Sequence, residues 1–290
     1  MSASGTVILE CSMITTAMIL CLAAPICQEV TPPTPTDSAV TLRGGAWLPR
    51  LGGTIESGPA GSGTGLDYAT DLDLGGIVPT ANFELEIDIN PWRIDLWGFQ
   101  TSEAGGTTSM SGFTFDTLTV APGAAIDTTF KASSLGISVS REFFRPYHSD
   151  ANAPGGDASS PSLVDLSFYA TVGMRWFDLS QSVESDGSMA TVDGQWLSAM
   201  IGGGFTLDLQ TRGRWPMLDA ISIDVHGEGG PAVGGTGGST WQIASTLTLT
   251  VSESIDLFFG YRLLETSLEQ RDTTLNPGLQ GLFVGGSIQF

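Results

Sequence analysis

The stretch 278–290, GLQGLFVGGSIQF, alternates apolar residues with small, polar or aromatic ones and ends on an aromatic side chain. Leu282, Val284, Ile288 and Phe290 fall on one face, and the residues between them fall on the other. A repeat of two residues is that of a β-strand, in which successive side chains point to opposite faces. The stretch therefore predicts a strand of about ten residues with one apolar face.

The same period of two recurs from Ala39 onward between glycine-rich breaks, and its clearest example is 163–176. There Val164, Phe168 and Val172 share an apolar face. A soluble β-sandwich would show the same alternation with its apolar face inward. We predict an all-β fold, an antiparallel up-and-down barrel of about ten strands with a range of eight to twelve. The expected strands are 39–48, 81–89, 92–103, 128–143, 163–178, 192–209, 217–228, 241–251, 255–265 and 279–290, and 111–121 is a candidate for a further short strand.

An apolar strand that closes the chain on Phe290 resembles the terminal strand of bacterial outer-membrane β-barrel proteins. The resemblance implies a transmembrane barrel, broadly similar to outer membrane protein A, in the outer membrane of a Gram-negative cell. Its implied partners are outer-membrane lipid and the barrel-assembly machinery, which would read the C-terminal strand with Phe290 as the insertion signal. The sequence leaves the oligomeric state open.

The connections between the expected strands alternate in length, as they do in outer-membrane barrels. With both termini periplasmic, the long connections 49–80, 104–127, 179–191, 229–240 and 266–278 would all lie outside the cell. Aromatic side chains near the strand ends are expected to form girdles at the two membrane surfaces. The outer girdle would hold Trp47, Trp176 and Trp241, and the periplasmic girdle Trp92, Phe143, Trp215 and Phe290.

Composition excludes several classes of function. The chain has 290 residues and a formal net charge of −20, and Lys131 is its only lysine, so no basic patch is available for nucleic acid. Cysteines occur only at 11, 21 and 27, so the barrel can hold neither a disulfide framework nor a thiolate metal site. We expect no metal and no cofactor. Residues 1–27 are predicted as a signal peptide, 28–38 as a Pro-rich leader and 39–290 as the barrel.

Charged residues of the expected strands fall mostly on the inward face, where they predict an ion-paired network in the lumen. The predicted network consists of Arg43, Glu84, Glu86, Asp88, Arg93, Asp165, Arg175, Asp256 and Arg262. Such a network could fill a narrow barrel. Alternatively, it could form a charged constriction that conducts ions or small solutes.

Two short acidic motifs suggest another alternative. Asp71 and Asp73, together with Asp224 and His226, resemble the paired motifs of the omptin outer-membrane proteases. The resemblance implies a His held by an Asp as general base, with the other carboxylates orienting a water. It covers only these four residues, and Asp71 and Asp73 together with Asp67 could instead bind calcium weakly.

The sequence thus favours a non-enzymatic envelope protein with a narrow, ion-paired lumen and acidic, Gly-rich surface loops. Such a protein would serve a structural or surface-interaction role. A small-solute pore and an omptin-like protease are the competing hypotheses.

Overall fold

The computed structural model describes residues 38–58, 63–147, 163–215, 217–233, 237–252, 254–270 and 272–290. The predicted signal peptide and all but the last residue of the predicted leader lie outside this range. Among the described residues, no helix is long and apolar enough to cross a membrane.

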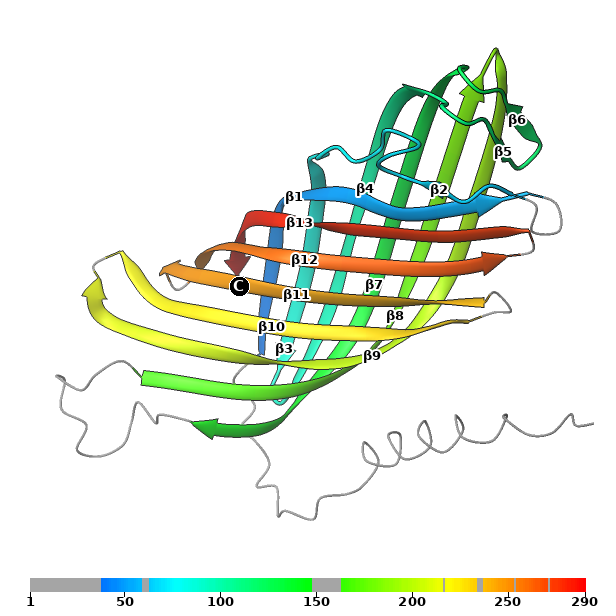
Figure 1. Ribbon diagram of the computed structural model, residues 1–290. Helices are drawn as coiled ribbons and strands as arrows, with labels where there is room; N and C mark the ends of the chain where they lie inside the picture. Colours follow the sequence, from blue (N-terminus) through cyan, green and yellow to red (C-terminus); the bar gives the residue numbers. More distant parts are fainter. Residues whose placement is uncertain are drawn as a thin grey trace, which may run out of the picture. The chain divides into compact units, whose positions relative to one another are not determined.

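Ten long antiparallel strands form a closed barrel (Figure 1). They are β1 (Ser38–Ser57), β3 (Thr80–Ile89), β4 (Trp92–Thr108), β7 (Ala125–Tyr147), β8 (Leu163–Ser185), β9 (Ser188–Trp215), β10 (Leu218–Val233), β11 (Gly237–Ser252), β12 (Ile255–Gln270) and β13 (Thr273–Gln289). Each pairs with the next in chain order, and β13 returns to pair with β1 in a continuous register from Thr41–Gln289 to Ser57–Thr273. The predicted fold class is confirmed.

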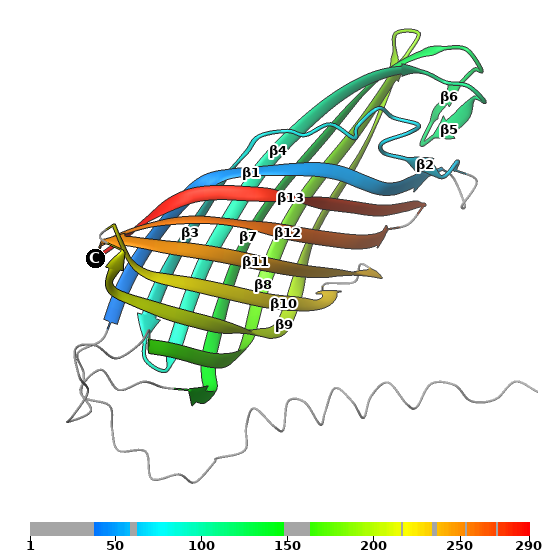
Figure 2. The same ribbon diagram turned by 60° about the vertical axis from the view of Figure 1, so that its left-hand side comes forward.

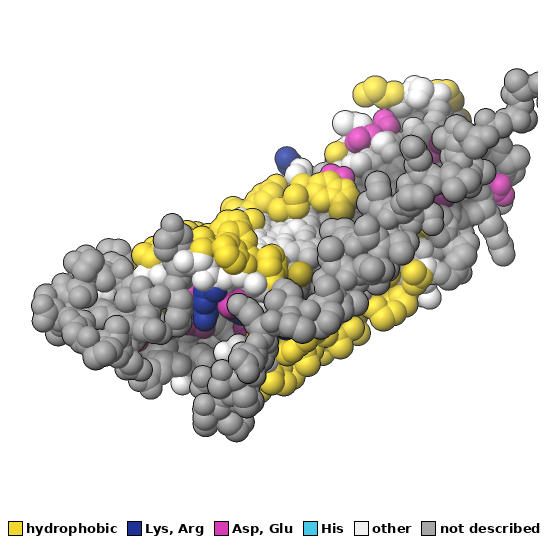
Figure 3. Space-filling model, turned by 90° about the horizontal axis from the view of Figure 1, so that it is seen from below, with side chains coloured by type: hydrophobic (Ala, Val, Ile, Leu, Met, Phe, Trp, Pro, Cys, Tyr) yellow, Lys and Arg dark blue, Asp and Glu magenta, His cyan; other side chains and the backbone are white. Residues whose placement is uncertain are grey.

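A belt of exposed apolar side chains surrounds the part of the barrel that holds the first residues of β1 and the last of β13. Its members include Val40, Leu42, Phe83, Leu135, Ile137, Val164, Val172, Met174, Trp176, Ile243, Leu257, Phe259, Leu282, Val284 and Ile288. On β8 the belt runs over twelve steps, from Val164 to Trp176, which at roughly 3.3 Å each and a tilt of about 45° rise roughly 28 Å. An apolar surface of this extent and height fits the hydrocarbon core of a membrane (Figure 3).

Polarity reverses on both faces of β8 just beyond Trp176. The outward face continues with Asp178 and Ser180, whereas the inward face changes from Arg175 to the buried Phe177. Beyond the belt, the barrel therefore has the polarity of a water-soluble protein, apolar inside and polar outside. We refer to this region as the outer part of the barrel.

The outer part corrects the predicted strand ends. The connections expected at 179–191, 229–240 and 266–278 are mostly strand, because β8 runs to Ser185, β9 begins at Ser188, and β10 to β13 are extended in the same way. The Ser, Asp and Gly residues there were interpreted as loop signals, but they occupy the solvent face of strands that continue past the membrane belt. At the other end, β7 continues to Tyr147, beyond the predicted strand end at 143.

An apolar core fills the interior of the outer part. Its members include Trp47, Leu51, Ile55, Phe99, Phe115, Phe130, Phe177, Leu179, Trp196, Leu264, Leu268, Leu275 and Leu279. Trp47 is fully buried and lies edge-on to Phe99, with 5.0 Å between ring centroids. The prediction that Trp47 belongs to an outer aromatic girdle is therefore wrong, because odd-numbered residues of β1 point inward. Trp176 and Trp241 are exposed at the outer end of the belt, and Trp92, Phe143 and Phe290 are exposed at its other end. The side chain of Trp215 lies outside the described range.

The segment 63–79, which we call the inserted segment, completes the barrel wall between the outer halves of β1 and β4. It carries β2 (Leu66–Asp67), which pairs with Thr54 and Ile55 of β1. On its other side, the amide of Gly76 donates a 2.7 Å hydrogen bond to Glu103 of β4. Four of its side chains, Leu66, Tyr68, Leu72 and Leu74, enter the core and are at most 4% exposed, whereas Ile77 is exposed.

The stretch 111–121 forms a small separate hairpin, β5 (Phe113–Phe115) with β6 (Leu118–Val120). It does not extend the barrel sheet. Instead, Phe113, Phe115 and Val120 are buried in the apolar core, beside β1 and β9. Figure 2 shows β5 and β6 at the same end of the barrel as β2, so the hairpin and the inserted segment together close the outer part.

Because polarity reverses along β8, an arginine introduced on its outward face should destabilise the barrel at one position and hardly at another. Val172→Arg places a charge in the apolar belt and should lower the free energy of unfolding by about 2–4 kcal/mol. Ser180→Arg lies beyond the belt and should change that free energy by less than about 0.5 kcal/mol. Urea unfolding in lipid vesicles measures both, and equal losses would contradict the assigned membrane boundary.

Candidate functional site

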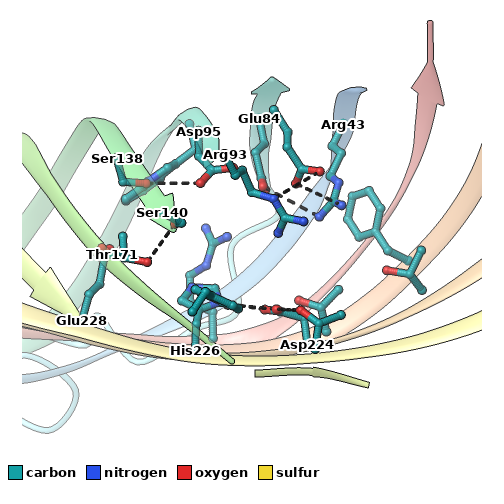
Figure 4. Close-up of a pocket in the computed structure, with 18 of the residues that line it drawn as sticks. Arg43, Glu84, Arg93, Asp95, Ser138, Ser140, Thr171, Asp224, His226 and Glu228 are labelled. Carbon is teal, nitrogen blue, oxygen red and sulfur yellow. Dashed lines mark hydrogen bonds and ion pairs between the residues drawn. The ribbon is translucent and has the colours of Figure 1, made fainter. Parts of the chain in front are cut away.

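A polar cavity of about 210 Å³ lies in the lumen, on the side of the apolar core away from the inserted segment. Figure 4 shows charged side chains from opposite walls pointing into it: Arg43, Glu84, Arg93 and Asp95 from one wall, Asp224 and His226 from the other. Trp97, Phe258 and Phe283 belong to the apolar core and also line the cavity. The site is therefore a charged chamber with an aromatic boundary.

A first cluster comes from the adjacent strands β1, β3 and β4. Glu86 is 5% exposed and receives two guanidinium groups, Arg43 Nη2 at 3.3 Å and Arg93 Nε at 3.7 Å. Arg93 also contacts Asp88 at 3.0 Å, and Arg43 lies 3.8 Å from Glu84. Side chains alternate between the two faces of a strand, so every second residue of β1, β3 and β4 points into the lumen. These inward residues lie beside one another on the paired strands, which brings the charged side chains together.

A second cluster forms around Arg175, which is 1% exposed. Its Nη2 donates to Glu228 Oε1 at 2.9 Å and to Gln242 Oε1 at 3.0 Å. The guanidinium lies 3.5 Å from the centroid of the Trp97 ring, a close cation–π contact. Trp97 fits there because its partner residue on β7 is Gly136, where a Cβ would come within 2.7 Å of the indole.

Asp224 is the centre of a third group. Its carboxylate accepts hydrogen bonds from the Tyr169 hydroxyl at 2.9 Å and the Thr206 hydroxyl at 3.0 Å, and it contacts His226 Nδ1 at 3.1 Å. Tyr169 reaches across because it packs over Gly204, where a Cβ would lie 2.7 Å from the hydroxyl oxygen. Asp224 and His226 both lie in the middle of β10.

Four of the nine residues of the predicted lumen network do not line the cavity. Asp88 and Arg175 pair with residues that do line it, Arg93 and Glu228. The other two, Asp165 and Asp256, have partners elsewhere. Asp165 forms an ion pair with Arg145 at 3.1 Å, and Asp256 accepts a 2.9 Å hydrogen bond from Ser287. Neither carboxylate is among the residues that line the cavity.

Asp71 and Asp73 belong to the inserted segment and do not line the cavity that holds Asp224 and His226. The Asp71 carboxylate accepts a 2.9 Å hydrogen bond from the amide of Asp67, and that of Asp73 accepts a 3.4 Å bond from the amide of Gly106. The structure therefore does not assemble the four residues of the protease motif in one site.

Carboxylates do converge elsewhere. The oxygens of Glu84, Glu86 and Asp95 all lie within 4.8 Å of one another. Among the described residues, Asp67, Asp71 and Asp73, the predicted calcium ligands, do not form such a group. Because Arg43 and Arg93 already pair with Glu86, a divalent cation there would meet two positive charges.

Several polar residues of the site were not singled out from the sequence. They are Asn82, Asp95, Tyr169, Thr206, Asp208 and Gln242. All six lie on the inward faces of barrel strands, so extending the same alternation along β3, β4, β8, β9 and β11 would have identified them. The prediction considered charged residues alone and so missed the neutral ones, and it also left out Asp95 and Asp208.

No protein-family model and no curated protein matches the chain. Several solved structures resemble it. The outer membrane protease OmpT of Escherichia coli is 9% identical with a TM-score of 0.46, and the match covers 90% of this chain and 99% of that one. Ail, the attachment invasion locus protein of Yersinia pestis, is 10% identical with a TM-score of 0.36 over 88% and 100% of the two chains. Neisserial surface protein A is 14% identical with a TM-score of 0.32 over 89% and 99%. The resemblance concerns the barrel fold.

Removing Arg175 should destabilise the barrel strongly. Arg175→Ala leaves Glu228, whose side chain is 9% exposed, without its ion-pair partner, and should cost about 3–5 kcal/mol. Arg145→Ala removes a guanidinium that is 38% exposed and should cost less than about 1 kcal/mol. Denaturant unfolding followed by tryptophan fluorescence compares the two variants, and a loss at Arg175 no greater than at Arg145 would contradict this role.

Proposed function

We propose that this protein is a non-conducting, non-enzymatic outer-membrane barrel that presents a folded, acidic platform at the cell surface. In this proposal the apolar belt crosses the outer membrane, the two chain ends lie on the periplasmic side, and the outer part projects from the cell. Its role is structural or interactive and does not involve transport.

The observation that carries the proposal is the apolar core of the outer part. Trp47, Phe99, Phe130 and Phe177 are at most 4% exposed and share one buried cluster with Leu264 of β12 and Leu279 of β13. The inserted segment and the β5–β6 hairpin contribute further side chains to the same cluster. A conducting barrel needs a continuous polar path, and close-packed apolar side chains exclude water and ions. The core therefore argues against the small-solute pore.

The core also argues against the protease. A protein substrate outside the cell would have to pass this packed region to reach Asp224 and His226, and the resemblance that suggested proteolysis needs Asp71 and Asp73 beside them. Hydrolysis of an external protein is therefore not supported by the arrangement.

The surface of the outer part is strongly acidic. Its exposed carboxylates include Asp71, Asp73, Asp127, Glu184, Asp186, Asp193, Glu265, Glu269 and Asp272. Among the described residues of the outer part, Arg50 and Lys131 are the exposed basic ones. Such a surface repels polyanions and attracts cationic partners over about a Debye length, roughly 8 Å in physiological salt.

Conductance tests the closed lumen. The folded barrel in a planar lipid bilayer should give no discrete current steps, because no water-filled path crosses the core. A porin reconstituted in the same bilayers provides the positive control, and gel mobility before and after boiling verifies that the barrel is folded. Reproducible steps from the folded barrel would overturn the proposal and favour a pore.

Labelling of intact cells tests the orientation. Residues 28–290 contain no cysteine, so single cysteines can be introduced at exposed methionines at opposite ends of the barrel. Met189→Cys, close to the β8–β9 turn, should react with a membrane-impermeant maleimide on intact cells, whereas Met217→Cys, close to the β9–β10 turn, should react only after permeabilisation. The unaltered chain measures background, and the reverse pattern would show that the acidic part faces inward.

A further inference from the structure

The chamber in the lumen contains a buried cation that has no counter-ion. Arg262 is 6% exposed and lines the cavity. Its Nη1 donates one hydrogen bond, of 3.2 Å, to the amide oxygen of Asn82, and its Nε has no partner. Among the described residues, no carboxylate oxygen lies within the 4.0 Å ion-pair distance of its guanidinium. A buried charge is normally paired, so this group is left with an unused capacity to bind an anion.

Three aromatic rings surround the guanidinium of Arg262 and define its position in the chamber. Its guanidinium lies between 5.4 and 5.6 Å from the ring centroids of Trp47, Trp97 and Phe283. Trp97 and Phe283 line the cavity, so Arg262 sits at its aromatic boundary. Arg43 also lines the cavity and has an Nε without a partner. The unpaired donors of the chamber therefore come from two different strands, β12 and β1.

Another part of the same chamber offers acceptors that are weakly used. Glu84, Glu86 and Asp95 present oxygens within 4.8 Å of one another. Glu86 pairs with two arginines, at 3.3 and 3.7 Å, whereas Glu84 has only the 3.8 Å contact with Arg43. Asp95 accepts a single long hydrogen bond among the described residues, 3.4 Å from Ser138. The carboxylates of Glu84 and Asp95 can therefore each accept a further hydrogen bond from a positively charged group.

The charge balance of the cavity selects between ligand classes. Its lining carries the six carboxylates of Glu84, Glu86, Asp95, Asp208, Asp224 and Glu228 against the three guanidinium groups of Arg43, Arg93 and Arg262, with His226 beside Asp224. Arg175, which is not part of the lining, pairs with Glu228, so carboxylates still exceed cations by two. A simple anion at Arg262 would meet this excess of carboxylates. A bare divalent cation at Glu86 would meet Arg43 and Arg93. A molecule that carries both charges satisfies the two unused groups without adding net charge.

We propose that the chamber binds a small zwitterion, an amino-acid-like solute whose carboxylate pairs with Arg262 and whose ammonium group lies between Glu84 and Asp95. Because roughly 10–15 Å³ of such space holds one water, a cavity of about 210 Å³ has room for on the order of fifteen waters or a solute of similar bulk. The apolar core blocks the outer side, so the solute enters from the end of the barrel where β1 begins. This site goes beyond the proposed surface role, which needs no ligand.

Calorimetry on the folded barrel in detergent tests the proposal. The probes are ω-amino acids from glycine to 6-aminohexanoate, which differ in the separation of their charges, with propionate and propylammonium as single-charge controls. At least one ω-amino acid should bind saturably, and neither single ion should bind at the same concentrations. Arg262→Gln and Asp95→Asn should each weaken binding about tenfold or more, as expected for the loss of a charged hydrogen bond.

Matched controls separate binding from folding. Asp193→Asn removes an exposed carboxylate of β9 outside the cavity and should leave the affinity unchanged. Heat-modifiable gel mobility confirms that each variant is folded, and the near-isosteric Asp95→Asn carries the test if Arg262→Gln does not fold. The proposal is overturned if no probe binds the unaltered barrel, or if binding survives unchanged in the folded variants. Because calorimetry measures solute binding and the bilayer experiment measures conductance, the zwitterion site and the closed lumen are tested independently of each other.

Discussion

Closure of the sheet is the constraint on which the rest of this structure depends. Inside a membrane the backbone finds no water to bond with, so every strand edge must be paired by another strand. The register between β1 and β13 meets this requirement from Thr41–Gln289 to Ser57–Thr273, along almost the full length of both strands. A closed sheet in turn fixes which side chains point outward and which share the narrow interior. The apolar belt, the charged chamber and the hydrophobic core all follow from that single division.

The barrel combines two solvation regimes in one continuous wall. Within the belt, lipid surrounds the outside and the interior must accommodate the polar residues. Beyond Trp176 water surrounds the outside, and burial of Phe177, Leu179 and their partners becomes favourable. The strands continue through the boundary, because the hydrogen bonds between their backbones do not depend on whether the side chains are apolar or polar. What changes is the residue type on each face, so the interior is charged at one level and apolar at the next.

The sequence was sufficient for the barrel and for the inward direction of its charged residues, because a period of two is a local signal. It was not sufficient for the strand ends. Phe177, Leu179 and Val183 continue the alternation of β8 with reversed polarity, and a search for outward apolar residues stops where that reversal begins. Nor does local pattern reveal that Tyr68 and Leu72 of a glycine-flanked stretch enter the core. Pairing partners within the site were also inaccessible: Arg175 and Glu228 are 53 residues apart, and only the register of β8, β9 and β10 brings them together.

The inserted segment gives the outer part an uneven construction. Most of the wall consists of long strand ladders, in which each residue is held by neighbours on both sides. Between β1 and β4 the wall depends on a two-residue strand, a few hydrogen bonds and four apolar anchors. Paired strands can form their hydrogen bonds one residue after another. The inserted segment contacts both β1 and β4, so its contacts need both strands to be in place. We therefore expect the four anchors to dock after the flanking strands have paired, on the part of the wall that the apolar belt does not cover.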